Sequence, residues 1–131
     1  FGLSDQIVVI NKKAPEGFEE LPTPTHVFIG GSSGALSDIL SAIQKKLIVK
    51  ENTKGKTDKA SKGVRVVINA VSLETIAQIT KLIQTYPVMQ LTQIQASRAH
   101  KLGSYNLMQA QNPVLIASFN LLPGDKMEAD E

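Results

Sequence analysis

Apolar runs of strand length alternate along this chain with amphipathic segments of helix length, and that alternation limits the folds that the chain can adopt. The longest run, VRVVINAV at residues 64–71, is rich in β-branched residues and typical of a strand buried on both faces of a sheet. Two other segments repeat apolar residues every three or four positions, as amphipathic helices do. Strands separated by helices predict an α/β fold with a mostly parallel sheet that helices cover on both faces.

The same patterns predict where the individual elements lie. One helical stripe covers residues 36–47. The other begins after Ser72, which is suited to cap a helix, and ends before Tyr86-Pro87, because proline disfavours helical geometry in the residue before it. The last two strands have no helix between them, so we expect them to form an antiparallel pair. The remaining elements are a short helical segment at 17–21, a polar loop at 97–112, and strands at 6–10, 27–29, 64–71, 88–96 and 113–122.

Length and charge fit a single domain over residues 1–131. Eight of the fourteen basic residues lie between Lys45 and Arg65, which raises the possibility of a nucleic-acid site. However, the polar stretch 51–63 within that region has no aromatic residue to stack on a base. We therefore expect 51–63 to be a solvated, mobile loop, and residues 125–131 to be an acidic tail.

The composition also excludes several classes of function. The chain has no cysteine, which rules out disulfides, thiolate metal sites and cysteine nucleophiles, and its two histidines make metal catalysis improbable. No apolar run approaches the roughly 20 residues that a membrane-spanning helix needs. Neither paired carboxylates nor a Ser-His-Asp set with suitable spacing occurs. We expect a cytoplasmic protein without metal, membrane or nucleic-acid partners, and, if it is an enzyme, one that works mainly by positioning reactants.

Glycines and polar residues gather where the predicted strands end, which is where ligands bind in open α/β sheets. The most informative stretch is GGSSG at 30–34. Its glycines let the backbone approach a ligand closely, and its amides lie at the start of a helix. A purely structural glycine turn with a serine cap is an equally good interpretation of this stretch. Asn69, at the end of another strand, is suited either to bind a ligand or to cap the next helical turn.

A second group of candidates follows the predicted strand at 88–96. Arg98, His100 and Lys101 lie within four residues of one another and have the chemistry to bind carboxylates, although ordinary surface placement explains them equally well. For Tyr105, the commoner role is that of a loop anchor packed on the sheet. For His26, just before a buried strand, we favour a structural role.

Four phrases of the sequence combine into a specific pattern. They are NKKAPEGFEEL at 11–21, HVFIGGSSG at 26–34, RVVINAVSLET at 65–75 and LTQIQASRAHKLGSYNLMQAQNPV at 91–114. Together they resemble the decarboxylating precorrin-6Y methyltransferase family of cobalamin biosynthesis, in the part that acts on precorrin-6B. The resemblance implies a Rossmann-like class I fold that uses S-adenosylmethionine to methylate a meso carbon of the tetrapyrrole and promotes loss of carbon dioxide from an acetate side chain. It also implies a homo-oligomer, such as a tetramer.

Matching the family's motifs to this sequence assigns roles to individual residues, but no catalytic residue. Precorrins carry many carboxylates, so basic residues beside the substrate are chemically reasonable. By resemblance, the cofactor-binding residues are Ala14, Gly30 and Gly31, and the substrate-binding residues are Ser32, Ser33, Gly34, Asn69, Arg98, Lys101 and Tyr105.

The sequence departs from the family pattern at its beginning. Family members start with a strand that ends in a G-x-G-x-G turn and a second strand that ends in an acid for the ribose hydroxyls, and this chain has neither. In the family's sheet order, 3-2-1-4-5-7-6, the predicted strand at 6–10 corresponds to strand 3 and lacks its neighbours. The first residue, Phe1, is not Met. We therefore expect a truncated fold of strands 3 to 7, the C-terminal portion of a longer enzyme, which binds S-adenosylmethionine weakly or not at all.

Two other interpretations stay open from the sequence. The chain is suited to be a non-catalytic α/β interaction module, with a structural glycine loop and an open sheet edge that pairs with a partner. It is also compatible with another S-adenosylmethionine-dependent methyltransferase. A G-x-G-x-G strand end upstream of Phe1 would argue against the first, and turnover of precorrin-6B by the full-length protein would argue against the second.

Overall fold

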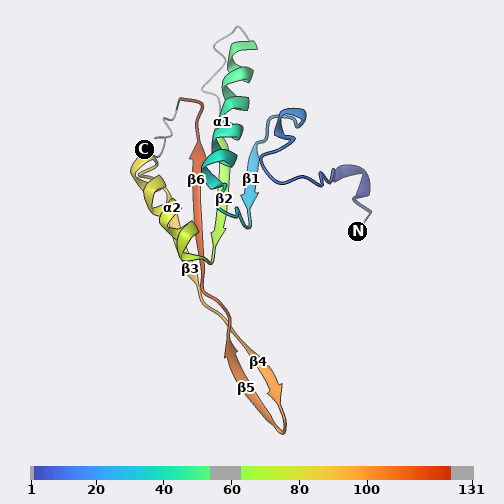
Figure 1. Cartoon of the computed structure of the whole chain (residues 1–131), viewed down its shortest axis with the longest axis vertical. Helices are drawn as coiled ribbons and strands as arrows, with labels where there is room; N and C mark the ends of the chain where they lie inside the picture. Colours follow the sequence, from blue (N-terminus) through green and yellow to red (C-terminus); the bar gives the residue numbers. More distant parts are fainter. Residues whose placement is uncertain (1, 54–62, 125–131) are drawn as a thin grey trace.

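A four-stranded sheet with two helices on one face forms the body of the protein, and a two-stranded hairpin extends from one end of it (Figure 1). The computed structural model describes residues 2–53 and 63–124. The sheet has the order β1-β2-β6-β3. The elements are η1 (Ser4–Gln6), η2 (Phe18–Glu20), β1 (His26–Ile29), α1 (Leu36–Thr53), β2 (Val64–Ala70), α2 (Leu73–Thr85), β3 (Gln90–Ile94), β4 (Ser97–Leu102), β5 (Tyr105–Ala110) and β6 (Val114–Leu121).

The directions of the strands confirm the predicted topology. β1 and β2 pair in parallel, as expected for strands joined by a helix. β6 runs antiparallel to both β2 and β3, so it is the one reversed strand of the sheet. The expected antiparallel pair of the last two sheet strands is therefore present, and the fold is the predicted truncated Rossmann-like sheet without its predicted first strand at 6–10.

The helices form on the predicted residues, and α1 buries its predicted stripe, whereas in α2 only Ile79 is fully buried and Leu73 is 79% exposed. The Ser72 side chain accepts a hydrogen bond of 3.2 Å from the backbone N–H of Thr75 and so caps α2. α2 ends at Thr85, just before Tyr86-Pro87. α1 continues to Thr53, three residues into the predicted loop 51–63. Residues 54–62 of that loop and the tail 125–131 lie outside the described residues. The buried stripe of α1 consists of Leu36, Ile39, Leu40, Ile43 and Leu47.

The core lies between the helices and one face of the sheet. Every second residue of β2, beginning with Val64, is fully buried on this face, and Val66 faces Phe119 of β6 across the ladder. The Phe119 ring also packs against Tyr86, with the ring centroids 4.6 Å apart. Tyr86 follows directly after α2 and therefore joins that helix to the sheet.

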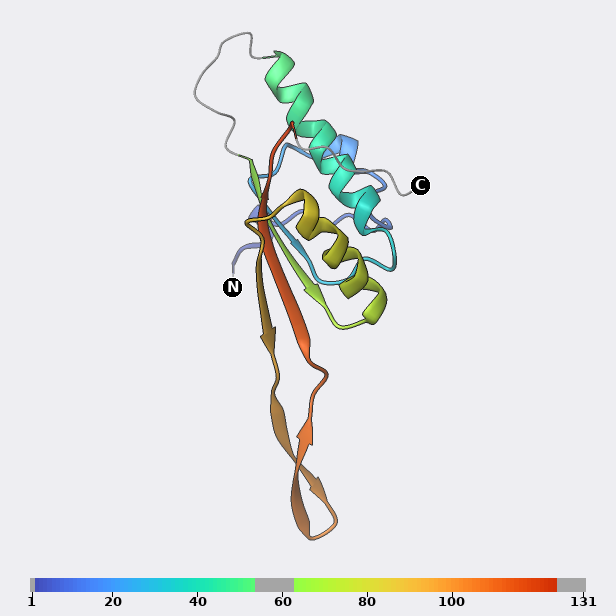
Figure 2. The ribbon, with the colours of Figure 1, turned by 90° about the vertical axis from the view of Figure 1, so that its left-hand side faces the viewer.

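The prediction that helices cover both faces of the sheet was wrong. Both helices lie on the same side, as Figure 2 shows. The intervening residues of β2, Arg65, Val67 and Asn69, are consequently only half-buried. On the neighbouring edge strand, Phe28 points to the same open face and is 65% exposed. The sequence pattern could not reveal this, because β-branched residues suit a strand whether one or both of its faces are covered.

The predicted strand at 6–10 does not form either. These residues have no strand pairing, and the segment extends away from the sheet toward the N-terminus (Figure 1). Its apolar side chains are largely open to solvent, with Val9 86% exposed. A strand needs a neighbour for its backbone hydrogen bonds, and the structure offers none beside this segment.

The polar segment 97–112 is not a loop but contains the hairpin of β4 and β5. Its strands pair from Ser97↔Ala110 to Leu102↔Tyr105, and Gly103 in the two-residue turn has a φ of 61°. A left-handed glycine in a two-residue connection matches the twist of a hairpin.

Among the described residues, no helix combines the length and apolarity required to cross a bilayer.

We predict that Phe119→Ala lowers the free energy of unfolding by about 3–5 kcal/mol, because it leaves a cavity at the centre of the core. Urea denaturation followed by circular dichroism measures this change. Phe28→Ala is the matched control: its ring lies on the open face, and we expect a loss below about 1 kcal/mol. Equal losses for the two variants would contradict the assignment of the core to the helical face.

Candidate functional site

The glycine loop and Asn69 lie at the same end of the sheet. β1 and β2 are parallel and in register at Ile29↔Ile68, so the residues that follow, Gly30 and Asn69, are level with each other at the carboxyl ends of both strands. Asn69 faces Ile116 of β6 on the open face of the sheet. The structure thus brings together two of the sequence candidates that lie almost forty positions apart.

The loop leaves open space where a ligand would need it. A side chain added at Gly31 or at Gly34 would meet no atom within 4 Å. Gly34 has a φ of 85° and Ser33 one of 47°, and these left-handed conformations turn the chain sharply into α1. The backbone N–H of Ala35 donates a 2.8 Å hydrogen bond to the Ser32 carbonyl, which closes the turn.

Ser32 and Gln78 are the polar side chains most closely tied to this loop. Ser32 is 7% exposed, and its hydroxyl oxygen is buried without a hydrogen-bond partner among the described residues. Gln78, on α2, donates through Nε2 to the Gly34 carbonyl over 3.3 Å, while its Oε1 is buried without a described partner. No sequence pattern points to Gln78, because its proximity to the loop arises only from the packing of α2.

Polar groups also occupy the open face beside Asn69. The guanidinium of Arg65 donates to Ser118 Oγ over 3.0 Å and to Asn120 Oδ1 over 3.4 Å. These two bonds join the Arg65 side chain of β2 to β6, where Asn120 is its direct partner in the ladder. This set was not foreseen, because it depends on the register between the two strands.

Ala14 lies in a different part of the structure. It packs against the core in the turn before η2, and the Lys46 ammonium of α1 donates to the backbone carbonyls of Glu19 and Leu21 beside that helical turn. Lys46 is ten residues along α1 from Leu36, which corresponds to about 15 Å. The turn that carries Ala14 is therefore placed along α1, away from the glycine loop, and the cofactor role of Ala14 stays a prediction.

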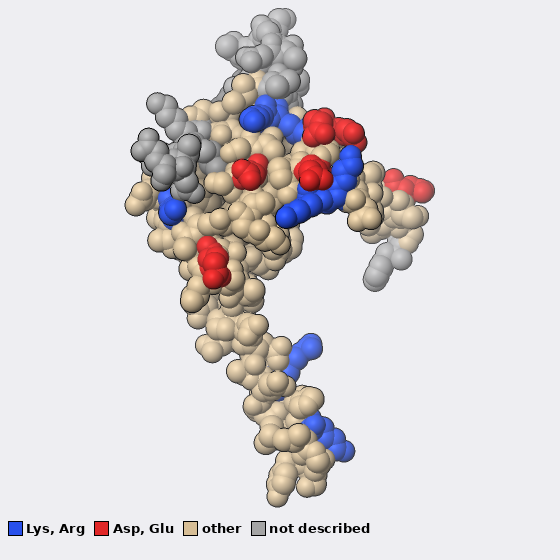
Figure 3. All heavy atoms as spheres, in the orientation of Figure 1, with Lys and Arg blue, Asp and Glu red and all other residues tan. Residues whose placement is uncertain are grey.

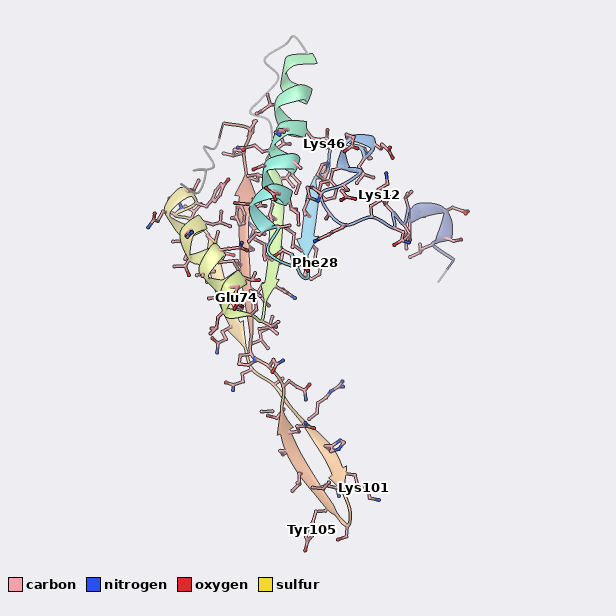
Figure 4. The ribbon with its side chains drawn as sticks, in the orientation of Figure 1. Lys12, Phe28, Lys46, Glu74, Lys101 and Tyr105 are labelled. Carbon is pink, nitrogen blue, oxygen red and sulfur yellow. The ribbon has the colours of Figure 1, made fainter. Side chains whose placement is uncertain are left out.

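The hairpin begins at the same end of the sheet as the glycine loop but carries its residues away from it. Lys101 and Tyr105 lie near the tip, as Figure 4 shows. Side chains alternate along paired strands, so Arg98, His100 and Tyr105 share one face of the hairpin, and Lys101 lies on the other. Within one chain the structure does not bring these side chains to the loop or to Asn69 (Figure 4), and the substrate-binding role of Arg98, Lys101 and Tyr105 stays a prediction.

The hairpin has an uneven charge. Residues 97–110 include Arg98 and Lys101 and no acidic residue. Figure 3 shows these basic side chains standing apart from the acidic groups of the body. All the hairpin residues are exposed.

Within the described part of the chain, no three His, Asp or Glu side chains gather in a way that could hold a metal ion.

Solved structures of methyltransferases share this fold. The C-terminal domain of precorrin-6Y C5,15-methyltransferase from Rhodobacter capsulatus is 32% identical, with a TM-score of 0.64, covering 91% of this chain and 56% of that one. Precorrin-6y C5,15-methyltransferase from Geobacter metallireducens is 27% identical, with a TM-score of 0.63, covering 85% and 52%. The chain therefore has a truncated Rossmann-like fold that it shares with these methyltransferases.

The sequence comparisons identify the family. The model of the precorrin methyltransferase domain matches residues 1–120, so the chain belongs to that family. A probable cobalt-precorrin-6B C(15)-methyltransferase (decarboxylating) of Pyrobaculum calidifontis is 32% identical over 117 residues, which are 88% of this chain and 53% of that protein. The chain thus spans about half the length of the curated relatives it matches.

The residues present fit S-adenosylmethionine only in part. The loop at 30–34 offers open space and flexible backbone for a close approach. However, the sequence contains no G-x-G-x-G turn, and the described sheet has no strand on the free side of β1. The groups that would hold the rest of such a cofactor are therefore not among the described residues.

Proposed function

We propose that this chain is the C-terminal part of an S-adenosylmethionine-dependent precorrin methyltransferase of cobalamin biosynthesis. The complete enzyme methylates a meso carbon of its tetrapyrrole and promotes loss of carbon dioxide from an acetate side chain. The observation that carries the proposal is the family match over residues 1–120, whose glycine loop and Asn69 meet at one end of the sheet. An open end of this kind is where ligands bind in α/β folds.

The chain's own residues would mainly bind and orient the reactants. Gly30 and Gly31 allow the cofactor to approach the backbone. Ser33 presents its exposed hydroxyl toward the tetrapyrrole, and Ser32 and Gly34 contribute backbone amides. Asn69 contributes an amide from the next strand. The cofactor arrives with an activated methyl group, so alignment by the protein supplies much of what the reaction needs.

The hairpin would supply charge for the substrate. Arg98 and Lys101 are exposed and have no acidic neighbour on the hairpin. Guanidinium and ammonium groups bind carboxylates through charge-assisted hydrogen bonds. Because the tip lies far from the glycine loop of its own chain, we propose that these residues, with Tyr105, border the site of a neighbouring copy in a homo-oligomer.

We predict that a complete polypeptide containing this sequence methylates precorrin-6B, and that Arg98→Gln raises its KM for that substrate roughly tenfold by removing one charge-assisted contact. Methyl transfer from labelled S-adenosylmethionine measures both. Lys45→Gln, on the exposed side of α1, is the control and should leave KM unchanged. Absence of methyl transfer to precorrin-6B would overturn the proposed substrate.

We predict that the chain self-associates through the hairpin. Leu102, Tyr105 and Leu107 share one face of it and are 62%, 73% and 49% exposed, which is unfavourable for an isolated two-stranded ribbon. Sedimentation velocity should show an oligomer that Leu107→Lys converts to monomer. Val88→Lys, at a position 84% exposed and outside the hairpin, should leave the oligomer intact. A monomeric wild-type chain at tens of micromolar would contradict this arrangement.

A further inference from the structure

Two buried polar atoms beside the glycine loop lack a hydrogen-bond partner among the described residues. They are Ser32 Oγ and Gln78 Oε1. A buried polar atom left unpaired is costly, so each such atom in a folded protein calls for an explanation. The two groups are chemically complementary, because a serine hydroxyl can donate a hydrogen bond, whereas an amide oxygen accepts hydrogen bonds and cannot donate them.

Gln78 is already attached to the loop at one point. Its Nε2 donates to the Gly34 carbonyl over 3.3 Å, across a sequence separation of 44 residues. Gly34 directly follows the strained Ser33 and lies two residues beyond Ser32. The amide oxygen Oε1 thus belongs to a side chain that is already hydrogen-bonded to the segment carrying the unpaired Ser32 hydroxyl.

We propose that Gln78 is a positioning residue that clamps the loop Gly30–Gly34 at two points. Nε2 holds the Gly34 carbonyl, and Oε1 accepts a hydrogen bond from the Ser32 hydroxyl once the serine side chain rotates about χ1. The second contact satisfies both buried atoms together. No bond to a ligand is involved, so the clamp forms within the chain itself.

The clamp gives Gln78 a role in the site, which rests on the proposed function of the loop. A loop fixed before binding does not lose conformational freedom when its ligand arrives, so affinity increases without a new contact. Because Gln78 belongs to α2, both helices then hold the loop. α1 follows it directly in the chain, and α2 contacts it through the Gln78 side chain.

Amide hydrogen exchange of the 131-residue chain, followed by NMR, tests the clamp without any ligand. The reporter is the Ala35 N–H, whose bond to the Ser32 carbonyl breaks when the loop opens. Under conditions in which the opening equilibrium limits exchange, Ser32→Ala and Gln78→Leu should each speed exchange at Ala35 roughly tenfold. The amide of Ile68 in the core strand should keep its rate, whereas a general loss of stability would raise both.

Combined variants test whether the two side chains act together. In the Gln78→Leu background, Ser32→Ala should not speed exchange at Ala35 any further, because the partner of the hydroxyl is already gone. In the Gln78→Glu background, which keeps an acceptor oxygen but loses the Nε2 donor, Ser32→Ala should still speed exchange. Gln84→Leu, on the exposed surface of α2, and Ser33→Ala, exposed in the same loop, are the matched controls and should leave Ala35 unchanged.

An effect of Ser32→Ala on the exchange rate at Ala35 with the opposite sign would overturn the proposal. If Ser32 Oγ stays unpaired, Ser32→Ala removes a costly buried atom and should slow exchange at Ala35 or leave it as it is. Additive effects of Ser32→Ala and Gln78→Leu would equally contradict a shared contact. The exchange measurement uses no cofactor or substrate. It can therefore refute the clamp while precorrin methylation is observed, or support the clamp while methylation is not observed, so the two proposals are tested separately.

Discussion

The antiparallel ladder between β2 and β6 holds the sheet together. It runs from Val64↔Leu121 to Ala70↔Leu115, with β1 attached only to β2 and β3 attached only to β6. The side chains that both strands direct toward the helices are buried, and the Phe119 ring at the centre meets Tyr86. Loss of this ladder would separate the sheet into two single-pair fragments, neither of which could cover its apolar face.

The same ladder determines where the site lies. β6 begins opposite the carboxyl end of β2, so the base of the hairpin, Asn69 and the loop at 30–34 all meet at one end of the sheet. The reversed direction of β6 is what brings the hairpin to that end. The base of the hairpin and the loop at 30–34 therefore lie at the same end of the sheet, although they are far apart in the sequence, while the tip of the hairpin extends away from it (Figure 1).

Periodicity and caps were sufficient to predict the helices and the strands that lie within the core. The stripe at 36–47 and the cap at Ser72 act through neighbours only a few residues away, so a single sequence contains the information. A signal for the hairpin is present in the sequence, because Gly103-Ser104, between the runs SRAHKL and YNLMQA, is a connection typical of a β-hairpin. Neither run contains a β-branched residue, however, and this composition favours a loop.

Other features depend on partners that sequence patterns do not contain. The run at 6–10 has strand-like composition, but no neighbouring strand pairs with it in the structure. The bare face around Val67 and Phe28 likewise reflects which elements pack there, not the composition of β2. In the site, the glycine loop and Asn69 could be predicted because they are strand ends, whereas Gln78 could not, because only the packing of α2 brings it to Gly34.

The central claim is that this chain supplies one side of a methyltransferase site whose cofactor-holding strands are not among its described elements. Isothermal calorimetry with S-adenosylmethionine tests it most directly, on the 131-residue chain alone and on a fusion in which the unmatched half of the Pyrobaculum calidifontis relative precedes it. We predict no micromolar binding by the chain alone and micromolar binding by the fusion. Micromolar binding by the chain alone would contradict the claim, as would a folded fusion that binds no more tightly than the chain.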